Sequence, residues 1–599
     1  MLLNYLKIAW RNMSRNKAFT TINIIGLALG LACFIVIALF INDELSFDKY
    51  NEKADQIVRV VFKGSVKGEQ MKEANVMPPV AQTLKADYPE VLEATRLRSY
   101  GKQRIAIGEK SFKEDELAYV DPNFFDVFTL PFISGDSKTA LLQPNTIVIS
   151  EAVATKYFAN QDPVGKSLVF KGLNANYTIT GVIKNIPANS HFHFDILAAM
   201  ATLPEAKEQS WMTSNFYTYL VLPKGYDYKK LEAKLPSAID KYLSPQLQQS
   251  MGMTMADFRK AGNNLGLYLQ PLTDIHLRSD VLFDLSTGGN LQTVYIFAAI
   301  AIFMLLIACI NFMNLSTAGA SKRAREVGIR KVLGSRKHQL VWQFLIDSIV
   351  LTFISLALAL LLVKLALPVF NTLSQKHLEF TLLNNPLTIG MLVVFGIVVG
   401  SLAGSYPAFF LSSFNTIAVL KSKFSSGKQS IGIRGGLVVF QFFVSITLIV
   451  CTIVVYNQLH YINNKDVGYD KEEVLLIGET YLLGKNEALL HNQLKNDTRV
   501  VNISTSSFLP AGPSNSNNFI VYPDYSETQL VKTLRYHVDP QYIPTMGMKL
   551  VAGRNFSENL ASDSNAIILN EASAKAFGWK NEALGHKITY SMNGGQKQS

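Results

Sequence analysis

Val-Asp-Pro-Asn-Phe-Phe at residues 120–125 returns later in the chain as Val-Asp-Pro-Gln-Tyr-Ile at residues 538–543. A second block, Ile-Val-Ile-Ser-Glu-Ala at 147–152, returns as Ile-Ile-Leu-Asn-Glu-Ala at 567–572. Both blocks lie at nearly the same distance from their copies, and each copy follows an apolar stretch of membrane length. We therefore predict an internal duplication whose unit is a membrane helix plus a soluble domain.

The second copy is shorter than the first. It reaches Ser599 without counterparts of the closing strands and the three helices that follow the first soluble region. We expect the natural protein to be longer, with three more spans, and a natural stop codon directly after Ser599 would contradict this.

The composition is that of a membrane protein. Of 599 residues, 48% are hydrophobic and only 17% are charged, which is too apolar for an ordinary soluble protein. A spanning helix needs about 20 mostly apolar residues. Five segments meet this requirement, and we predict spans at 21–42, 289–314, 343–367, 387–410 and 435–457. The apolar run of the first is too long for a signal peptide and lacks a small-residue cleavage site, so it is a retained anchor.

These spans divide the rest of the chain into six parts, at 1–20, 43–288, 315–342, 368–386, 411–434 and 458–599. The first has apolar residues at helical spacing, which predicts an amphipathic helix on the membrane surface. Residues 43–288 and 458–599 are the large soluble regions. In the former we expect strands at 57–62, 146–149 and 177–183 and helices at 79–97 and 151–158. The predicted fold is an α-helical membrane bundle with α+β domains outside the cytoplasm.

The net charge of +11 is a topology signal rather than a sign of nucleic-acid binding. Residues 1–42, 315–342 and 411–434 together hold fifteen Lys and Arg and a single acid, Glu326. Short loops rich in Lys and Arg stay in the cytoplasm. The N-terminus is therefore predicted inside the cell, and both large soluble regions outside.

The sequence motifs that could indicate catalysis, cofactor binding or metal binding are each better explained as structural features. Gly165-Lys166-Ser167 lacks the earlier glycine of a phosphate-binding loop, so we interpret it as a turn. His191, His193 and Asp195 lie on one face if the segment is a strand, but no further ligand is evident, so surface or hydrogen-bonded strand residues are the better interpretation. The three cysteines, Cys33, Cys309 and Cys451, fall inside predicted spans and are interpreted as packing residues.

Polar residues inside the predicted spans are few. Asn23, Asn311, Asn314 and Asp347 lie near the inner ends, and Lys364 lies toward the outer end of the third span. Such residues can mark an ion path, but helix-packing hydrogen bonds or positions at the membrane interface explain them better.

The loop at 315–342 carries more than charge. Val327, Ile329 and Leu333 are spaced for partial burial among basic residues, and Gly334 provides a turn. Topology requires only the bases, not the apolar positions. A helix with such a mixed surface is suited to docking on a soluble partner.

Arg-Glu-Val-Gly-Ile-Arg at 325–330, followed by Leu333-Gly334, resembles the signature of FtsX-like (MacB-type) ABC transporter permeases. Trp10-Arg11-Asn12 near the N-terminus and Gly-Ser-Tyr-Pro-Ala at 404–408 are similar to the same family, in its duplicated eight-span form. The resemblance covers essentially the whole chain, apart from the last three spans and the end of the second soluble domain.

The resemblance implies a permease subunit without catalytic activity of its own, in the bacterial inner membrane. A dimer of a separate cytoplasmic ATPase binds it, and ATP hydrolysis moves the periplasmic domains, for efflux or for handling of lipoproteins or antimicrobial peptides. The docking helix would include Arg323, Arg325, Glu326, Val327, Gly328, Ile329, Arg330, Lys331, Leu333, Gly334 and Arg336. Of these, Arg325, Arg330 and Lys331 would make polar contacts, and Val327, Ile329 and Leu333 would form the buried face.

Other roles and partners stay open. One alternative is a conventional exporter whose substrate passes between the helices. Another is a signalling protein that controls a cell-wall hydrolase or senses peptide antibiotics. Besides the bilayer, a periplasmic adaptor, an outer-membrane channel and a second permease copy remain open as partners, and neither a cofactor, a metal nor nucleic acid is expected.

Overall fold

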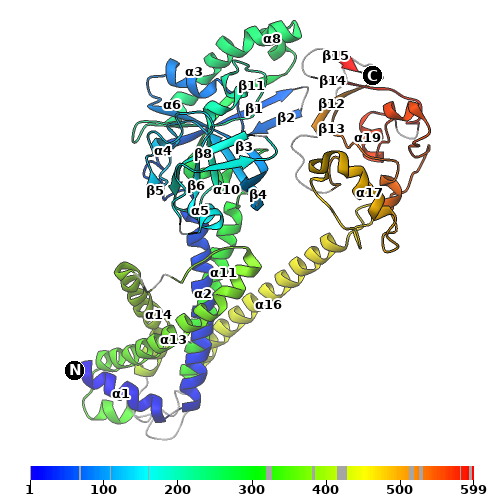
Figure 1. Cartoon of the computed structure of the whole chain (residues 1–599). Coiled ribbons are helices and arrows are strands. Elements are labelled where there is room, and N and C mark those ends of the chain that lie inside the picture. The colour runs from blue at the N-terminus through cyan, green and yellow to red at the C-terminus, as the bar shows by residue number, and fades with distance from the viewer. Residues whose placement is uncertain are drawn as a thin grey trace. The chain divides into compact units, whose positions relative to one another are not determined.

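The computed structural model describes residues 2–598, except 16, 67–68, 108–109, 160, 174, 319–326, 381–382, 384, 414–427, 511–517, 525–530, 580–581 and 593–595 (Figure 1). The chain divides into two compact units, which are described separately. The first comprises residues 1–244 and 255–455, and the second comprises residues 245–254 and 456–599.

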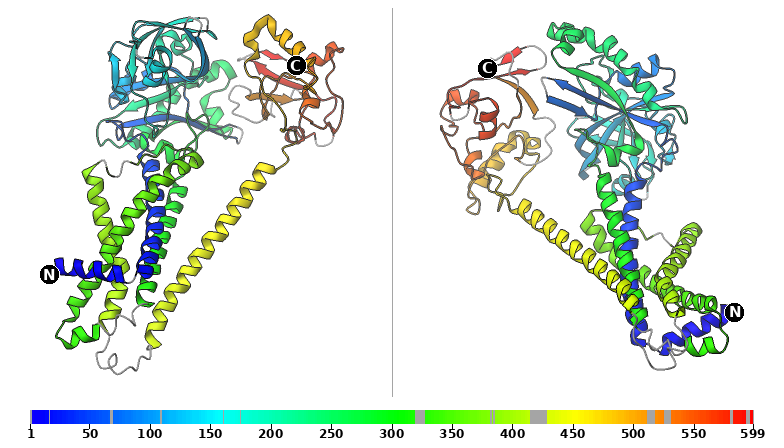
Figure 2. Two further views of the ribbon diagram at one scale, coloured as in Figure 1. Left: turned by 60° about the horizontal axis from the view of Figure 1, so that its bottom comes forward. Right: turned by 180° about the vertical axis from the view of Figure 1, so that it is seen from behind.

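Five helices are long and apolar enough to cross a membrane, which confirms the predicted bundle. They are α2 (Lys17–Ser46), α11 (Leu291–Ala318), α13 (Lys337–Ser374), α14 (Pro386–Ser412) and α16 (Lys428–Asn464). A separate helix, α1 (Leu2–Arg15), precedes them. Helices α2 and α11 run side by side in all three views, and each is joined closely to the first soluble domain (Figures 1 and 2).

Small residues let the helices of the bundle approach closely. A Cβ added to Gly30 of α2 would lie 2.4 Å from Ala308 Cβ of α11. On α14, Cβ atoms at Gly400 and Gly404 would lie 2.8 Å from Ile349 Cα and 2.6 Å from Ser348 Cβ of α13. In a bilayer, association of helices depends on such close packing because lipid removes the hydrophobic drive. The α13–α14 and α2–α11 pairs are therefore tightly packed.

The first soluble domain is built on an eleven-stranded sheet in the order β11-β1-β10-β3-β4-β9-β6-β8-β5, with β2 and β7 attached beside it. Its strands are β1 (Ile57–Val66), β2 (Glu69–Glu73), β3 (Glu93–Ile107), β4 (Lys110–Val120), β5 (Phe132–Gly135), β6 (Thr146–Ser150), β7 (Ser167–Phe170), β8 (Ala175–Ile183), β9 (Ile196–Ala199), β10 (Tyr217–Val221) and β11 (Asn264–Pro271). Pairing is mostly antiparallel, with parallel β4–β9 and β6–β8 pairs.

Short helices lie between these strands and after the last of them. They are α3 (Val80–Asp87), α4 (Phe124–Val127), α5 (Glu151–Phe158), α6 (Tyr228–Glu232), α7 (Leu235–Ala238), α9 (Met255–Lys260) and α10 (Ile275–Arg278). Helix α8 (Ser244–Met251) falls almost entirely in the segment assigned to the second unit. The prediction of one helix over 79–97 is wrong. Helix α3 ends before Tyr88, whose backbone is extended because it precedes Pro89, and β3 begins at Glu93.

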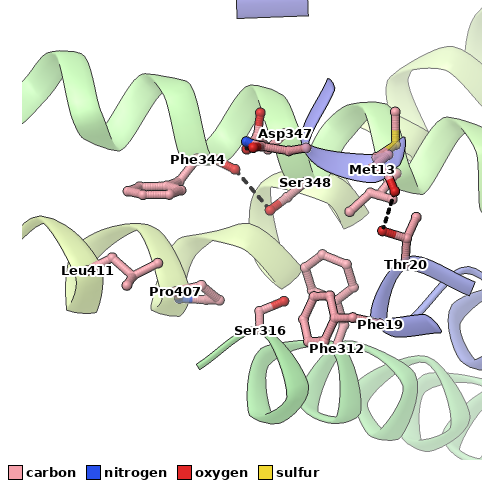
Figure 3. A pocket seen from close by; sticks show the side chains of 12 residues that line it. Met13, Phe19, Thr20, Phe312, Ser316, Phe344, Asp347, Ser348, Pro407 and Leu411 are labelled. Carbon is pink, nitrogen blue, oxygen red and sulfur yellow. Dashed lines mark hydrogen bonds between the residues drawn. The ribbon is translucent and has the colours of Figure 1, made fainter. Parts of the chain in front are cut away.

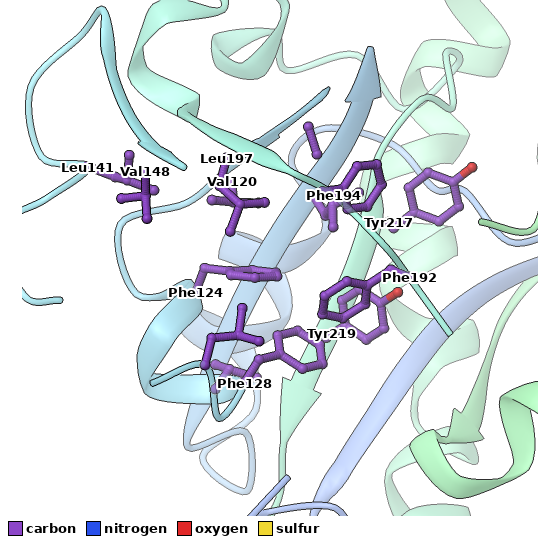
Figure 4. Close-up of a cluster of buried hydrophobic side chains, with 14 of the residues drawn as sticks. Val120, Phe124, Phe128, Leu141, Val148, Phe192, Phe194, Leu197, Tyr217 and Tyr219 are labelled. Atoms are coloured by element: carbon purple, nitrogen blue, oxygen red, sulfur yellow. The ribbon is translucent and has the colours of Figure 1, made fainter. Parts of the chain in front are cut away.

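Both faces of the sheet carry a hydrophobic core, because alternate residues of a strand point to opposite sides. Along β4, Ala118 and Val120 belong to one cluster, and Leu117 and Tyr119 belong to the other. The first cluster is rich in aromatic rings, including Phe124, Phe128, Phe192 and Tyr219 (Figure 4). These cores explain how the domain folds without disulfides, since the described cysteines are all free and lie in the spans.

The His-Phe-His-Phe segment at 191–194 is not a surface strand, and its buried side chains attach the end of α2 to the soluble domain. Strand β9 begins only at Ile196, and His191 is fully buried. Its Nδ1 lies 2.8 Å from Asp48 Oδ1 and its Nε2 lies 2.7 Å from the Tyr219 hydroxyl oxygen. Asp48 follows directly after α2, so this buried contact fastens the end of the first span to the sheet.

The second unit contains a four-stranded sheet in the order β13-β12-β14-β15. Its strands are β12 (Asn518–Pro523), β13 (Val531–Leu534), β14 (Ile588–Met592) and β15 (Gln596–Gln598), and its α-helices are α17 (Glu487–Lys495), α18 (Tyr542–Thr545) and α19 (Glu571–Ala576).

Local geometry at matched positions of the two soluble regions supports the duplication. Ser150 caps α5 by accepting a hydrogen bond from the Val153 amide, and Asn570 caps α19 by accepting one from the Ser573 amide. The repeated glycines also agree, since φ is +91° at Gly135 and +83° at Gly553. A positive φ favours glycine at both positions, so the repeat preserves turns as well as sequence.

Candidate functional site

The basic loop between α11 and α13 contains a short helix. Residues 327–332 are helical, and the chain then turns at Gly334, where φ is +97°. The Ser335 amide donates to the Arg330 carbonyl at 3.0 Å, which closes the helix end. We call residues 327–336 the elbow. The predicted turn at Gly334 is present.

One side of the elbow is buried against the bundle. Val327 is only 2% exposed and belongs to a cluster with Leu340 and Phe344 of α13 and Ala408 and Leu411 of α14. The elbow therefore packs on the first turns of α13 and the last turns of α14 at once.

Two basic residues strengthen this attachment. The Lys331 ammonium donates to the Ser412 carbonyl oxygen at 2.7 Å, and the Arg330 guanidinium donates to the Gln343 side-chain oxygen. Burial and the neighbouring Lys337 lower the pKa of Lys331, as expected when a cation loses water near another cation. Both basic side chains thus make contacts inside the chain that hold the elbow to α13 and α14.

The opposite side of the elbow is apolar and open. Ile329 is 48% exposed, Val332 65% and Leu333 79%. These three residues are spaced i, i+3 and i+4, so they share one helix face. Val327 cannot share it, because positions two residues apart in a helix are about 200° apart around the axis. Residues 327, 329 and 333 therefore do not form the single apolar face that was expected. Val327 faces the bundle, and Ile329 and Leu333 lie on the opposite, open face.

The remaining predicted residues are placed as follows. Gly328 is buried and Arg336 is exposed, whereas Arg323, Arg325 and Glu326 lie outside the described residues. Sequence reasoning missed Val332, Gln343 and Ser412. Val332 could have been found from its helical spacing to Ile329, but Ser412 could not, because its contact is 81 residues away in sequence.

A small cavity of about 30 Å³ lies where α1, α2, α11, α13 and α14 converge (Figure 3). Its lining includes Thr20, Phe312, Asp347, Ser348 and Pro407. The Asn12 amide donates to an Asp347 carboxylate oxygen at 3.4 Å, which brings α1 against α13. Phe344 and Leu411 line the cavity and also contact the elbow through their cluster. This end of the bundle is a common meeting point for five helices and the elbow.

The turn at Gly165-Lys166-Ser167 leads into a strand rather than a helix. Gly165 has a φ of +83° and its amide donates to the Ile179 carbonyl at 2.8 Å, and β7 begins at Ser167. A phosphate-binding loop needs a following helix N-terminus, so the structural interpretation is preferred. Within the described part of the chain, no three His, Cys, Asp or Glu side chains are grouped to hold a metal.

Comparison with known proteins matches two segments of the chain to family models. Residues 20–238 match the MacB-like periplasmic core domain, and residues 298–416 match the FtsX-like permease C-terminal domain. The second match contains the elbow and its neighbours α13 and α14.

The relatives are distant in sequence, and the chain spans all of one of them but less than two thirds of the MacB proteins. An uncharacterized ABC transporter permease, YvrN, of Bacillus subtilis is 22% identical, covering 70% of this chain and 100% of that protein. The macrolide export ATP-binding/permease protein MacB of Bdellovibrio bacteriovorus is also 22% identical, covering 70% of this chain and 62% of that protein. Its counterpart in Campylobacter jejuni strain 81-176 is 28% identical over 24% of this chain and 22% of its own length.

Among solved structures, a domain of a putative permease from Porphyromonas gingivalis is similar. It is 26% identical, covers 37% of this chain and 91% of that domain, and has a TM-score of 0.33.

Spanning helices that carry a large soluble domain at one end and the packed elbow at the other define a multi-pass membrane protein. The two family matches and the relatives indicate which class of membrane protein this is. The chain is an ABC transporter permease of the MacB/FtsX type.

Proposed function

We propose that this chain couples ATP hydrolysis by a separate cytoplasmic ATPase subunit to movement of its soluble domains on the far side of the bacterial inner membrane. The single observation that carries the proposal is the open apolar face of the elbow, which is fixed from behind to α13 and α14. An exposed apolar stripe on a short helix fits a groove in a soluble partner. Because the elbow is packed on α13 and α14, a movement of the partner would be transmitted to these two helices.

The distribution of charge supports the orientation. Three basic segments, at 1–42, 315–342 and 411–434, are predicted to face the cytoplasm. The elbow lies in one of them, so the docking face would be on the side where ATP is abundant. The soluble domains would then lie in the periplasm.

The interior of the bundle favours transmission of force over passage of substrate between helices. Along the described spans α2, α11, α13 and α14, the buried charged side chains are Glu44 and Asp347, and they lie toward opposite ends. Gln343, Ser348, Thr352 and Ser355 of α13 are buried as well, but the three hydroxyls donate to carbonyl oxygens of their own helix. The backbone of α13 therefore satisfies these hydroxyl donors within the helix, and Gln343 accepts from Arg330 of the elbow.

Substitution of Leu333 by Asp tests the docking claim. A charge on the open face should abolish co-purification of the partner ATPase subunit, because burying an unpaired carboxylate in an apolar groove is costly. The matched control is Leu373→Asp, since Leu373 is 81% exposed at the other end of α13.

Leu333→Asp should still insert in the membrane, because Leu333 makes little contact within the chain. Equal recovery of the ATPase with Leu333→Asp and with Leu373→Asp would remove the docking claim.

A further inference from the structure

The outer ends of the spans meet the first soluble domain through a buried cluster of charges. Glu44, near the end of α2, is only 6% exposed. One of its oxygens lies 2.9 Å from His276 Nε2 of α10, and the other lies 2.6 Å from the Lys376 ammonium, directly after α13. Lys376 also contacts Asp43 at 3.0 Å. A single carboxylate therefore joins the first span, the third span and the soluble domain.

Aromatic packing closes the cluster. The Phe47 ring stacks on the His276 imidazole, with ring centroids 3.4 Å apart and planes 2° apart. The Lys376 ammonium lies 4.9 Å from the centroid of Phe47, in cation–π range. Burial alone would lower the pKa of Lys376, but its hydrogen bonds to Glu44 and Asp43 raise that pKa above the ordinary value. The lysine thus stays charged beside the carboxylates.

The backbone around the cluster is shaped to allow these contacts. A Cβ on Gly289 would lie 2.4 Å from Glu44 Oε2 and 2.9 Å from His276 Nε2, so a side chain at this position would displace the Glu44 carboxylate and the His276 ring from their contact. On the other side, Gln375 takes a left-handed conformation with φ +54°. The Asn371 side chain donates to and accepts from the Leu378 backbone, at 3.0 and 3.1 Å. This turn aims Lys376 back at α2.

We infer that Glu44 and Lys376 form a latch that makes the outer end of α13 move together with α2 and the first soluble domain. The inference rests on the proposed function, for which it supplies the far end of the path. The elbow is fixed to the first turns of α13. At 1.5 Å per residue, the 38 residues of that helix extend roughly 57 Å. Among the described residues, the ion pairs of Lys376 with Glu44 and Asp43 connect the outer end of α13 to the end of α2, and Glu44 continues the connection to His276 of the soluble domain.

The test measures whether the domain and the end of α13 move as one body. All three native cysteines are replaced by alanine, and spin labels are placed at Lys138→Cys in the soluble domain and Thr372→Cys at the end of α13, both exposed positions. Distances between the labels are measured by pulsed electron resonance on the full chain in lipid nanodiscs, without nucleotide or partner.

The unmodified latch should give one narrow distance distribution. Glu44→Gln, Lys376→Ala and Gly289→Ala should each broaden it about twofold, since each weakens the contact that holds the end of α13 to α2. Lys376→Arg, which keeps the charge, should restore most of the narrow distribution. The control Lys364→Ala removes an exposed lysine of the same helix and should change nothing, as should Gly390→Ala, whose Cβ would meet no atom within 4 Å.

Glu44→Gln keeps the size of the side chain, so it guards against a variant that fails to fold. Distributions that stay narrow in Glu44→Gln and Lys376→Ala would overturn the latch, as would equal broadening in the controls. The spin-label distances are measured without the ATPase, so their outcome does not depend on whether the elbow docks on an ATPase. Retained ATPase binding by Leu333→Asp would refute the proposed function while leaving a positive label result intact.

Discussion

At the scale of single residues, buried ion pairs hold the segments that connect the spans to the first soluble domain. Arg59 of β1 is fully buried, and its guanidinium donates to both carboxylate oxygens of Asp284, at 2.5 and 3.0 Å. Gln270 and Ser279 also accept from Arg59. Asp284 lies on the segment that returns to α11, so this network holds that segment against the sheet.

Asp284→Asn should destabilise the first soluble domain by about 3 kcal/mol at neutral pH, because it leaves the buried charge of Arg59 uncompensated. Burial alone would raise the pKa of Asp284, but the contacts with Arg59 hold it below its ordinary value of 3.8. A carboxyl whose folded pKa is lowered contributes stability above its unfolded pKa and loses it as pH falls through the folded pKa.

The difference in thermal stability between the wild-type chain and Asp284→Asn should therefore be full at pH 7 and shrink below about pH 3.8. Thermal unfolding of the detergent-solubilised full chain at several pH values measures this. Arg278→Ala, at an exposed arginine nearby, is the control. An Asn variant as stable as wild type at pH 7 would contradict the role given to the pair.

Single residues were also where the sequence was least informative. Glu44 and His276 are 232 positions apart, and Asp43 and Lys376 are 333 apart, so periodicity could not pair them. His191 was interpreted from the sequence as a surface or hydrogen-bonded strand residue, whereas its complete burial before β9 depends on the folded sheet. Ile329 and Leu333 were found from composition and resemblance, whereas the inward orientation of Val327 required the bundle.

At the scale of elements, length and hydropathy are strong predictors of spans, because a bilayer imposes one thickness on every helix. All five spans appear in the structure, and several extend beyond their predicted ends. Short soluble elements are harder to predict from pattern. The helix expected over 79–97 ends early because Pro89 and the pairing of β3 with β10 prevail over the local apolar spacing.

The glycines of α14 lead to a prediction about helix packing. Gly404→Val should destabilise the α13–α14 pair by roughly 1–3 kcal/mol, since the added side chain would overlap Ser348. Thermal aggregation of the detergent-solubilised chain measures this. Gly390→Val on the same helix is the matched control, because a Cβ there meets no atom within 4 Å. Equal melting of the two variants would show that the close approach at Gly404 is not needed.

At the scale of the whole molecule, the proposed function requires one orientation of the chain in the membrane. In a chain with its native cysteines replaced, Lys138→Cys should react with a membrane-impermeant thiol reagent added to spheroplasts, and Arg336→Cys should react only after lysis. Both side chains are exposed, so access depends on the membrane alone. Labelling of Arg336→Cys in intact spheroplasts would place the elbow outside and contradict the proposed topology.

The most direct test of the coupling is the ATP turnover of the neighbouring ATPase subunit, reconstituted in proteoliposomes with and without this chain. We predict that the wild-type chain changes turnover severalfold and that Leu333→Asp abolishes this change, while Leu373→Asp retains it, because only the first alters the docking face. An identical turnover with and without the chain would contradict the claim that the elbow receives the motion of an ATPase.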